Sequence, residues 1–137
     1  MRRKKGPKHF YEVKQRISEV IQKINENASL VLVEGKNDER ALRRARLKTP
    51  IITFCDSNMP RFEFVERIAG NYGGQRVVVL FDYDKEGSVA AKRMTVDLEE
   101  KGVRVEGKVR EELGEILVWE GIRRVEEMMS VLSKADL

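Results

Sequence analysis

Residues Val77–Gly87 read VVVLFDYDKEG, an apolar run followed directly by two acids that one residue separates. A short unbroken apolar run is typical of a strand that is buried on both faces of a sheet. Acids that follow such a strand lie at the carboxyl edge of the sheet, where open α/β folds bind ligands. Asp82 and Asp84 are therefore candidates for a binding site at this edge.

An earlier stretch has the same pattern, because Glu34 and Gly35 follow the apolar residues Leu30–Val33. Two strand ends that both present carboxylates predict a site for a hard cation, since Mg²⁺ prefers oxygen ligands. We take Asp82, Asp84 and Glu34 as candidate metal ligands. Glu34 is also a candidate to relay a proton in place of binding the metal.

Residues beside these acids are candidates for binding a substrate. Gly35 and Gly87 lack side-chain bulk where the backbone turns sharply or approaches a phosphate. Lys36 and Lys85 stand next to the acids and are expected to meet a nucleic-acid backbone. A metal held by two or three carboxylates keeps positions open for a phosphate, and it neutralises charge that develops on a phosphodiester.

The rest of the chain alternates between strand and helix patterns. We expect strands near residues 30–33, 51–54, 77–81 and 103–105, and helices near 10–26, 37–47, 60–71, 88–101 and 122–133. Asn37 is the expected cap of the second helix, and residues 110–118 are ambiguous, with one or two helical turns expected. This alternation predicts an α/β fold with a parallel sheet of about four strands and helices on both faces. The common strand order 2-1-3-4 would place Glu34 beside Asp82 and Asp84.

Length and composition limit the classes of protein that remain. The 137 residues make one ordinary domain, and the lone Cys55 cannot form an internal disulfide. One cysteine and one histidine argue against a zinc site. No apolar run approaches the roughly 18 residues of a membrane helix. We therefore expect a cytoplasmic protein without a membrane partner.

Positive charge is concentrated at the start of the chain. Residues 1–9 hold five Lys or Arg and no acid, whereas the remainder holds 22 basic and 23 acidic residues. We expect residues 1–9 to form a basic flexible tail, which is either a frayed terminus or a segment that holds phosphates. Residues 10–137 are expected to form a single domain.

The two strand ends resemble the motifs of the Toprim family, a catalytic domain shared by topoisomerases, bacterial primases and several nucleases. The motifs are E-G-x-x-D at residues 34–38 and D-x-D-x-x-G at residues 82–87. The resemblance covers about residues 28–107, and it leaves an N-terminal helix over 10–26 and a helical extension over 108–137. The first motif is most similar to that of small stand-alone Toprim proteins and of the 5S ribosomal RNA maturation nucleases.

This resemblance implies a Rossmann-like Toprim fold and a role for each motif residue. It implies that Glu34 is the general acid or base, that Asp82 and Asp84 bind Mg²⁺ or Mn²⁺, and that Asp38 belongs to the substrate-binding residues. The implied activity is that of a metal-dependent phosphodiesterase, nuclease-like and acting on structured RNA or DNA. The alternative is a non-catalytic module that binds metal together with nucleic acid or a protein partner. A phosphatase acting on small phosphate esters is a third class.

Other interpretations of the D-x-D motif are weaker. The two acids could serve only as helix caps and turn residues. A calcium-binding EF-hand loop needs an acid at its twelfth position, where this chain has Arg93. The motif also resembles that of haloacid-dehalogenase phosphatases, which place it on the first strand, whereas here it follows the third.

The chain departs from the Toprim pattern at two places. Tyr83 stands where many members have proline, and we expect it to be a packing or surface residue. Residues 55–57 replace a glycine that is usual after the second strand, so that Asp56 is expected to be a further acid in the groove. Trp119, outside the motifs, is expected to anchor the C-terminal segment.

Overall fold

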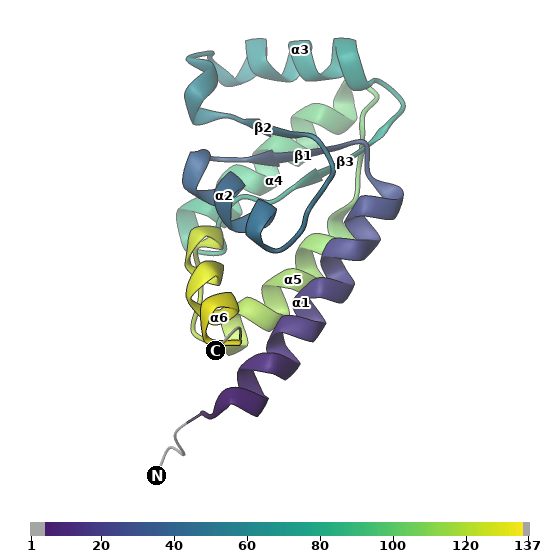
Figure 1. The fold of residues 1–137 in the computed structure, drawn as a ribbon. Coiled ribbons are helices and arrows are strands. Elements are labelled where there is room, and N and C mark those ends of the chain that lie inside the picture. The colour runs from purple at the N-terminus through teal and green to yellow at the C-terminus, as the bar shows by residue number, and fades with distance from the viewer. Residues whose placement is uncertain (1–4, 136–137) are drawn as a thin grey trace.

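The computed structural model describes residues 5–135 as an α/β fold built on one parallel sheet (Figure 1). The sheet contains β1 (Leu30–Val33), β2 (Ile51–Thr53), β3 (Arg76–Val79) and β4 (Arg104–Val105). Its strand order is β2-β1-β3-β4, with every neighbouring pair parallel. The predicted fold class and strand order are therefore confirmed, and β1 and β3 are the two central strands.

Six α-helices and two short 3₁₀ helices surround this sheet in the described residues. They are α1 (Pro7–Asn27), α2 (Lys36–Arg44), η1 (Cys55–Ser57), α3 (Arg61–Tyr72), α4 (Lys85–Glu100), α5 (Gly107–Trp119), η2 (Val125–Glu127) and α6 (Met128–Ala135). Over residues 5–135, no helix is long and apolar enough to cross a membrane.

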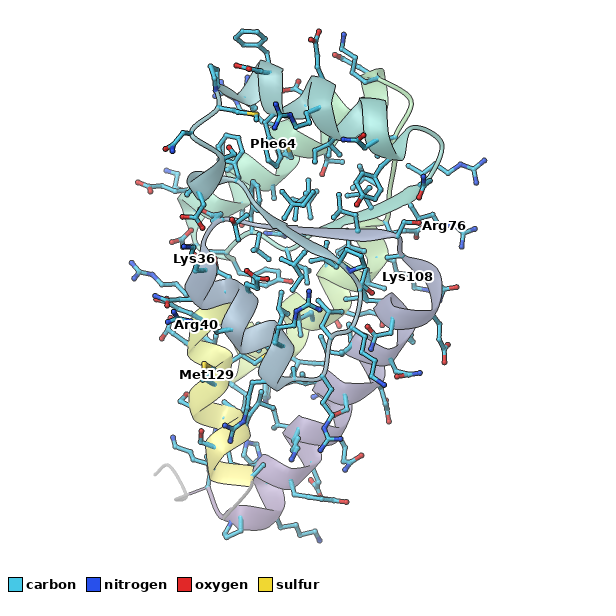
Figure 2. All side chains as sticks on the ribbon, turned by 45° about the horizontal axis from the view of Figure 1, so that its top comes forward. Lys36, Arg40, Phe64, Arg76, Lys108 and Met129 are labelled. Atoms are coloured by element: carbon cyan, nitrogen blue, oxygen red, sulfur yellow. The ribbon has the colours of Figure 1, made fainter. Side chains whose placement is uncertain are left out.

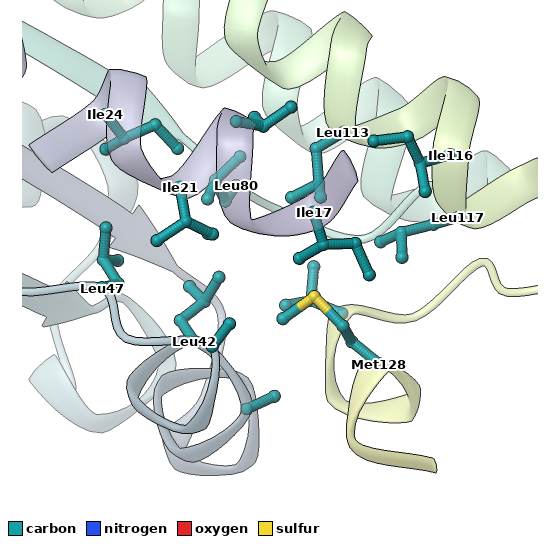
Figure 3. Close-up of a cluster of buried hydrophobic side chains, with 14 of the residues drawn as sticks. Ile17, Ile21, Ile24, Leu42, Leu47, Leu80, Leu113, Ile116, Leu117 and Met128 are labelled. Atoms are coloured by element: carbon teal, nitrogen blue, oxygen red, sulfur yellow. The ribbon is translucent and has the colours of Figure 1, made fainter. Parts of the chain in front are cut away.

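Alternate residues of the central strands enter two separate cores. Leu30 and Leu32 pack with α3 and α4, and Figure 2 shows Phe64 between α3 and the sheet. Val31 and Val33 face the opposite core, which α1, α2, α5 and α6 cover (Figure 3). Because both faces are covered, the strands read as unbroken apolar runs.

The pairing of β1 with β3 determines where the two motifs meet. Leu32 is the partner of Val79 in the parallel register, and the backbone N–H of Leu80 donates to the carbonyl of Leu32 at 2.8 Å. The two strands therefore end at the same edge of the sheet, within a few residues of each other. The motifs therefore lie at neighbouring strand ends.

The N-terminal boundary of the folded part differs from the prediction. Helix α1 begins at Pro7, so the predicted tail over 1–9 is wrong in its last three residues. Proline suits the first turn of a helix, where its missing N–H has no intrahelical partner to lose. His9 also contacts Glu120 at 2.7 Å. Residues 1–4 of the predicted tail lie outside the described residues.

Two further predictions about local structure were wrong, and the ambiguous stretch over 110–118 is part of a longer helix. Helix α2 begins at Lys36 with Gly35 as its N-cap, so Asn37 is inside the helix. Residues 110–118 belong to a helix of 13 residues, α5, whose apolar side is buried against α1. Trp119 is 80% exposed and does not anchor the C-terminal segment. Tertiary burial of one helix face, which a short sequence window does not show, stabilises α5.

Helix α5 also supports the loop between β3 and α4 through Tyr83. The Tyr83 hydroxyl donates to the carbonyl of Arg110 at 2.7 Å, and the Arg110 guanidinium lies 4.4 Å from the centre of the Tyr83 ring. The ring packs directly on Gly114, where an added Cβ would lie 2.6 Å from Cε1 of the ring. Tyr83 is therefore a packing residue, and it requires glycine on the facing helix.

We predict that Gly114→Ala destabilises the protein by about 1–3 kcal/mol, because the methyl group would overpack a ring that is already fixed. Gly107→Ala is the matched control on the same helix, since its Cβ would meet no atom within 4 Å. That substitution should change the free energy of unfolding by less than about 1 kcal/mol. Urea denaturation measures both, and equal effects would contradict the role of Tyr83.

Candidate metal centre

Glu34 and Asp82 meet at the carboxyl edge of the sheet. Glu34 follows β1, and its Oε1 accepts a hydrogen bond from the backbone N–H of Asp82 at 2.9 Å. This contact joins residues that are 48 positions apart in sequence. The first motif is thus bonded directly to the second.

The C-terminal segment, by which we mean residues 110–126, also contacts the D-x-D loop that follows β3. The backbone N–H of Val125 donates to Oδ1 of Asp82 at 2.8 Å, and the backbone N–H of Tyr83 donates to the carbonyl of Arg123 at 2.6 Å. Arg110 donates from one guanidinium nitrogen to the carbonyls of Phe81 at 3.1 Å and Asp82 at 2.9 Å. Residues of the predicted extension therefore hold the D-x-D loop in place.

Two of the motif acids also stabilise helix starts. Asp84 is the N-cap of α4, and its Oδ1 accepts from the backbone N–H of Gly87 at 2.7 Å. Asp38 lies in the first turn of α2, and its Oδ2 accepts from the backbone N–H of Gly35 at 3.1 Å. Of the two D-x-D acids, Asp84 is thus a helix cap, as one interpretation of the motif held, although its carboxylate has a second oxygen.

The space available for a side chain differs between the two motif glycines. A Cβ on Gly87 would lie 2.4 Å from the carbonyl oxygen of Asp82, so no side chain fits there. Gly35 has an extended backbone, and its Cβ would meet no atom within 4 Å. The protein therefore requires glycine at position 87, whereas at position 35 glycine leaves space open.

A cleft of about 340 Å³ lies between these segments, and we call it the acidic cleft. Its lining residues are Glu34, Gly35, Lys36, Asn37, Asp38, Cys55, Asp82, Asp84, Glu86, Gly87, Arg124 and Glu126. All the residues predicted from the two motifs are among them except Lys85. Lys36 lies at the start of α2, on the same side of the molecule as Arg40 and Met129 (Figure 2). Lys85 lines a neighbouring cavity.

Sequence reasoning also missed residues of this cleft and included one that lies elsewhere. Arg124 and Glu126 line the cleft from the C-terminal segment, where no motif or spacing marks them. Asp56 was expected to add an acid, but it is exposed, does not line the cleft, and accepts from the Thr53 hydroxyl at 3.0 Å. Cys55, its neighbour, lines the cleft in its place.

Burial and mutual repulsion raise the pKa of three acids in the cleft. Burial is the main cause for Glu34, whose pKa the nearby carboxylates of Asp82 and Asp84 raise further. Burial also raises the pKa of Asp82, with Asp84 and Glu126 adding to the effect. For Asp38, burial and then the charge of Asp82 raise the pKa to about 6. A cation in the cleft would relieve this repulsion.

The donor set of the acidic cleft fits Mg²⁺. Its donors are carboxylate oxygens, and Glu34, Asp82 and Asp84 each use one of their two oxygens for a backbone N–H. Within residues 5–135, no three His, Cys, Asp or Glu side chains form a group that could hold a metal ion. Mg²⁺ usually keeps several waters and takes only one or two carboxylates, so it does not need such a group.

The sequence model of the Toprim domain matches residues 29–109. The chain belongs to the Toprim domain family, as its motifs indicated. Membership associates it with metal binding and with nucleic-acid chemistry. The match ends just before Arg110, so the residues that hold the D-x-D loop from the C-terminal side lie outside it.

Archaeal proteins are similar to the chain over nearly its whole length. A UPF0292 protein of Thermococcus gammatolerans is 34% identical over 131 residues, which cover 93% of this chain and 94% of the relative. The UPF0292 protein of Methanocaldococcus jannaschii is 29% identical, over 88% and 92% of the two chains. A solved structure of a protein from Aquifex aeolicus has a TM-score of 0.62 at 28% identity, over 82% of this chain and 94% of that one.

We predict that Asp38→Asn stabilises the protein at neutral pH when metal is absent. Because the pKa of Asp38 is raised from 3.8 to about 6, its charge destabilises the fold above pH 6, and this cost disappears below about pH 3.8. The amide keeps an acceptor for the N–H of Gly35. The gain should be on the order of 1 kcal/mol at pH 7.5 and shrink toward pH 4.

Urea denaturation in EDTA at several pH values measures this difference. A variant that is less stable than the parent by the same amount at every pH would contradict the prediction. The hydrogen bond to Gly35 would then outweigh the cost of the charge.

Proposed function

We propose that the chain is a Mg²⁺-dependent phosphodiesterase that cleaves structured RNA or DNA. The observation that supports this most is the acidic cleft, where the E-G-x-x-D and D-x-D-x-x-G motifs converge. Lys36 and Arg124 line the same cleft and supply positive charge for phosphate oxygens. A site of mixed charge at the carboxyl edge suits a phosphodiester better than a neutral ligand.

Three acids of the cleft have separate roles in this proposal. Asp82 and Asp84 hold the metal through the oxygens that do not accept backbone hydrogen bonds. Bound Mg²⁺ supplies charge that stabilises the negative charge developing on the phosphate. Glu34 takes the proton of the attacking water, because its Oε1 is fixed on the N–H of Asp82 while Oε2 is left for the reaction.

One observation favours the alternative of a non-catalytic module. Asp84 and Asp38 already stabilise helix starts, so these acids have a structural use without any chemistry. In that case the cleft binds a metal and a nucleic acid or protein partner without cleaving anything. Cleavage and binding must therefore be measured separately.

We predict that the protein cleaves labelled hairpin RNA or DNA in Mg²⁺ or Mn²⁺. Asp82→Ala and Glu34→Gln should each lower the rate about 100-fold or more, as expected for losing a metal ligand or a general base. Asp56→Asn is the matched control, because Asp56 is an exposed acid that does not line the cleft. It should leave the rate unchanged.

The same experiment distinguishes the alternatives. Cleavage that persists at the parent rate in Asp82→Ala and Glu34→Gln would refute the proposal. Absence of cleavage together with metal-dependent binding of the hairpin would support the non-catalytic module.

A further inference from the structure

A second, larger cavity of about 680 Å³ lies beside the acidic cleft, and we call it the α3–α4 pocket. It is bounded by the residues after β2, by the start of α3, by Phe81 after β3 and by one side of α4. The proposed cleavage reaction does not use it. Lys85, the motif-adjacent residue that is absent from the acidic cleft, lines this pocket.

The interior of the pocket is apolar and partly aromatic. Phe54 and Phe81 line it, and their ring centres lie 6.4 Å apart. Val89 and Met94 of α4 line the same space. Val89 is 53% exposed. Its aliphatic side chain faces an open apolar cavity.

Charged side chains also line the pocket. Three are cationic, Arg61, Lys85 and Arg93, and two are acidic, Glu34 and Glu86. Arg61 is held by Asp97, whose Oδ2 lies 2.8 Å from its Nε. Lys85 and Arg93 are eight residues apart on α4, so they lie on the same side of the helix as Val89. An apolar lining with an excess of cationic side chains suits a ligand that is both planar and phosphorylated.

The pocket is continuous with the acidic cleft, because Glu34, Cys55 and Glu86 line both. A phosphate in the cleft would therefore have its own nucleoside at the entrance of the pocket. A base that is paired within a duplex cannot enter such a cavity, whereas an unpaired or flipped-out base can.

We propose that the α3–α4 pocket binds one unpaired nucleobase of a nucleic acid whose phosphate lies in the acidic cleft. This inference rests on the proposed function and deepens it. The substrate is then nucleic acid with a single-stranded or extruded nucleotide beside the cleaved bond. Stacking on Phe54 and contact with Val89 supply affinity without requiring a particular base.

The test uses the nucleoside 2-aminopurine riboside in EDTA, so that neither metal nor phosphate contributes. NMR titration should show shifts of backbone amides around Phe54 and along 85–94, and ribose alone should show none. Val89→Glu should weaken binding about fivefold or more, because it should remove an interaction comparable to the stacking of one base. The glutamate should leave the helix intact, because Val89 is exposed and the new side chain lies between Lys85 and Arg93.

Val96→Glu is the matched control, because Val96 is 45% exposed on the same helix and does not line the pocket. It should bind the nucleoside as the parent does. Equal binding by Val89→Glu and the parent, or shifts located elsewhere, would overturn the proposal. So would a titration in which acetyl-leucine amide shifts the pocket amides and the nucleoside does not, since a protein partner would then be indicated.

A second experiment distinguishes failure of the pocket assignment from failure of the proposed cleavage activity. RNA with an abasic site beside the cleaved bond should be cleaved at least about fivefold less efficiently in Mg²⁺ than the intact RNA. If no RNA is cleaved but the nucleoside binds as described, the proposed function fails and the pocket assignment stands. If intact and abasic RNA are cleaved equally and the nucleoside does not bind, the pocket assignment fails alone.

Discussion

The site depends on how Asp82 is held between two distant parts of the chain. Its backbone N–H donates to Glu34, and its carboxylate accepts from the backbone N–H of Val125. One contact joins the two motifs, and the other joins the second motif to the C-terminal segment. Because both involve fixed backbone groups, the carboxylates of Glu34 and Asp82 are oriented before any ligand arrives. Such preorganisation lowers the cost of binding a cation or a phosphate.

The C-terminal segment is therefore part of the site. Arg110 bonds the carbonyls of Phe81 and Asp82, and its own carbonyl accepts from Tyr83. Arg124 and Glu126 add charge of both signs to the acidic cleft. The Toprim match stops at residue 109, yet the similarity to the Thermococcus gammatolerans protein spans 93% of the chain. That similarity extends beyond the matched domain into the helices that complete the cleft.

Much of the fold and half of the site follow from the sequence. The apolar runs at 30–33 and 77–81, each ended by an acid, predicted two central parallel strands and their adjacent ends. The contribution of the C-terminal segment could not be predicted, because Val125 acts through a backbone N–H that every residue except proline carries. The length of helix α5 was underestimated because the helix is stabilised by burial against α1, which its local sequence does not show.

Charge distinguishes the two cavities at this edge of the sheet. The acidic cleft holds carboxylates whose repulsion favours a cation, whereas the α3–α4 pocket combines apolar side chains with three cationic and two acidic ones. Glu34 lies at their junction. Under the proposed function, a nucleotide would suit both environments at once, with its phosphate in the acidic cleft and its base in the α3–α4 pocket.

Paramagnetic broadening by Mn²⁺ tests most directly whether three separate segments form one metal centre. At substoichiometric Mn²⁺, the backbone amides of residues 34–38, 82–87 and 124–126 should broaden first and together. Broadening spread over exposed acids elsewhere, or limited to one of the three segments, would contradict a metal centre at this edge.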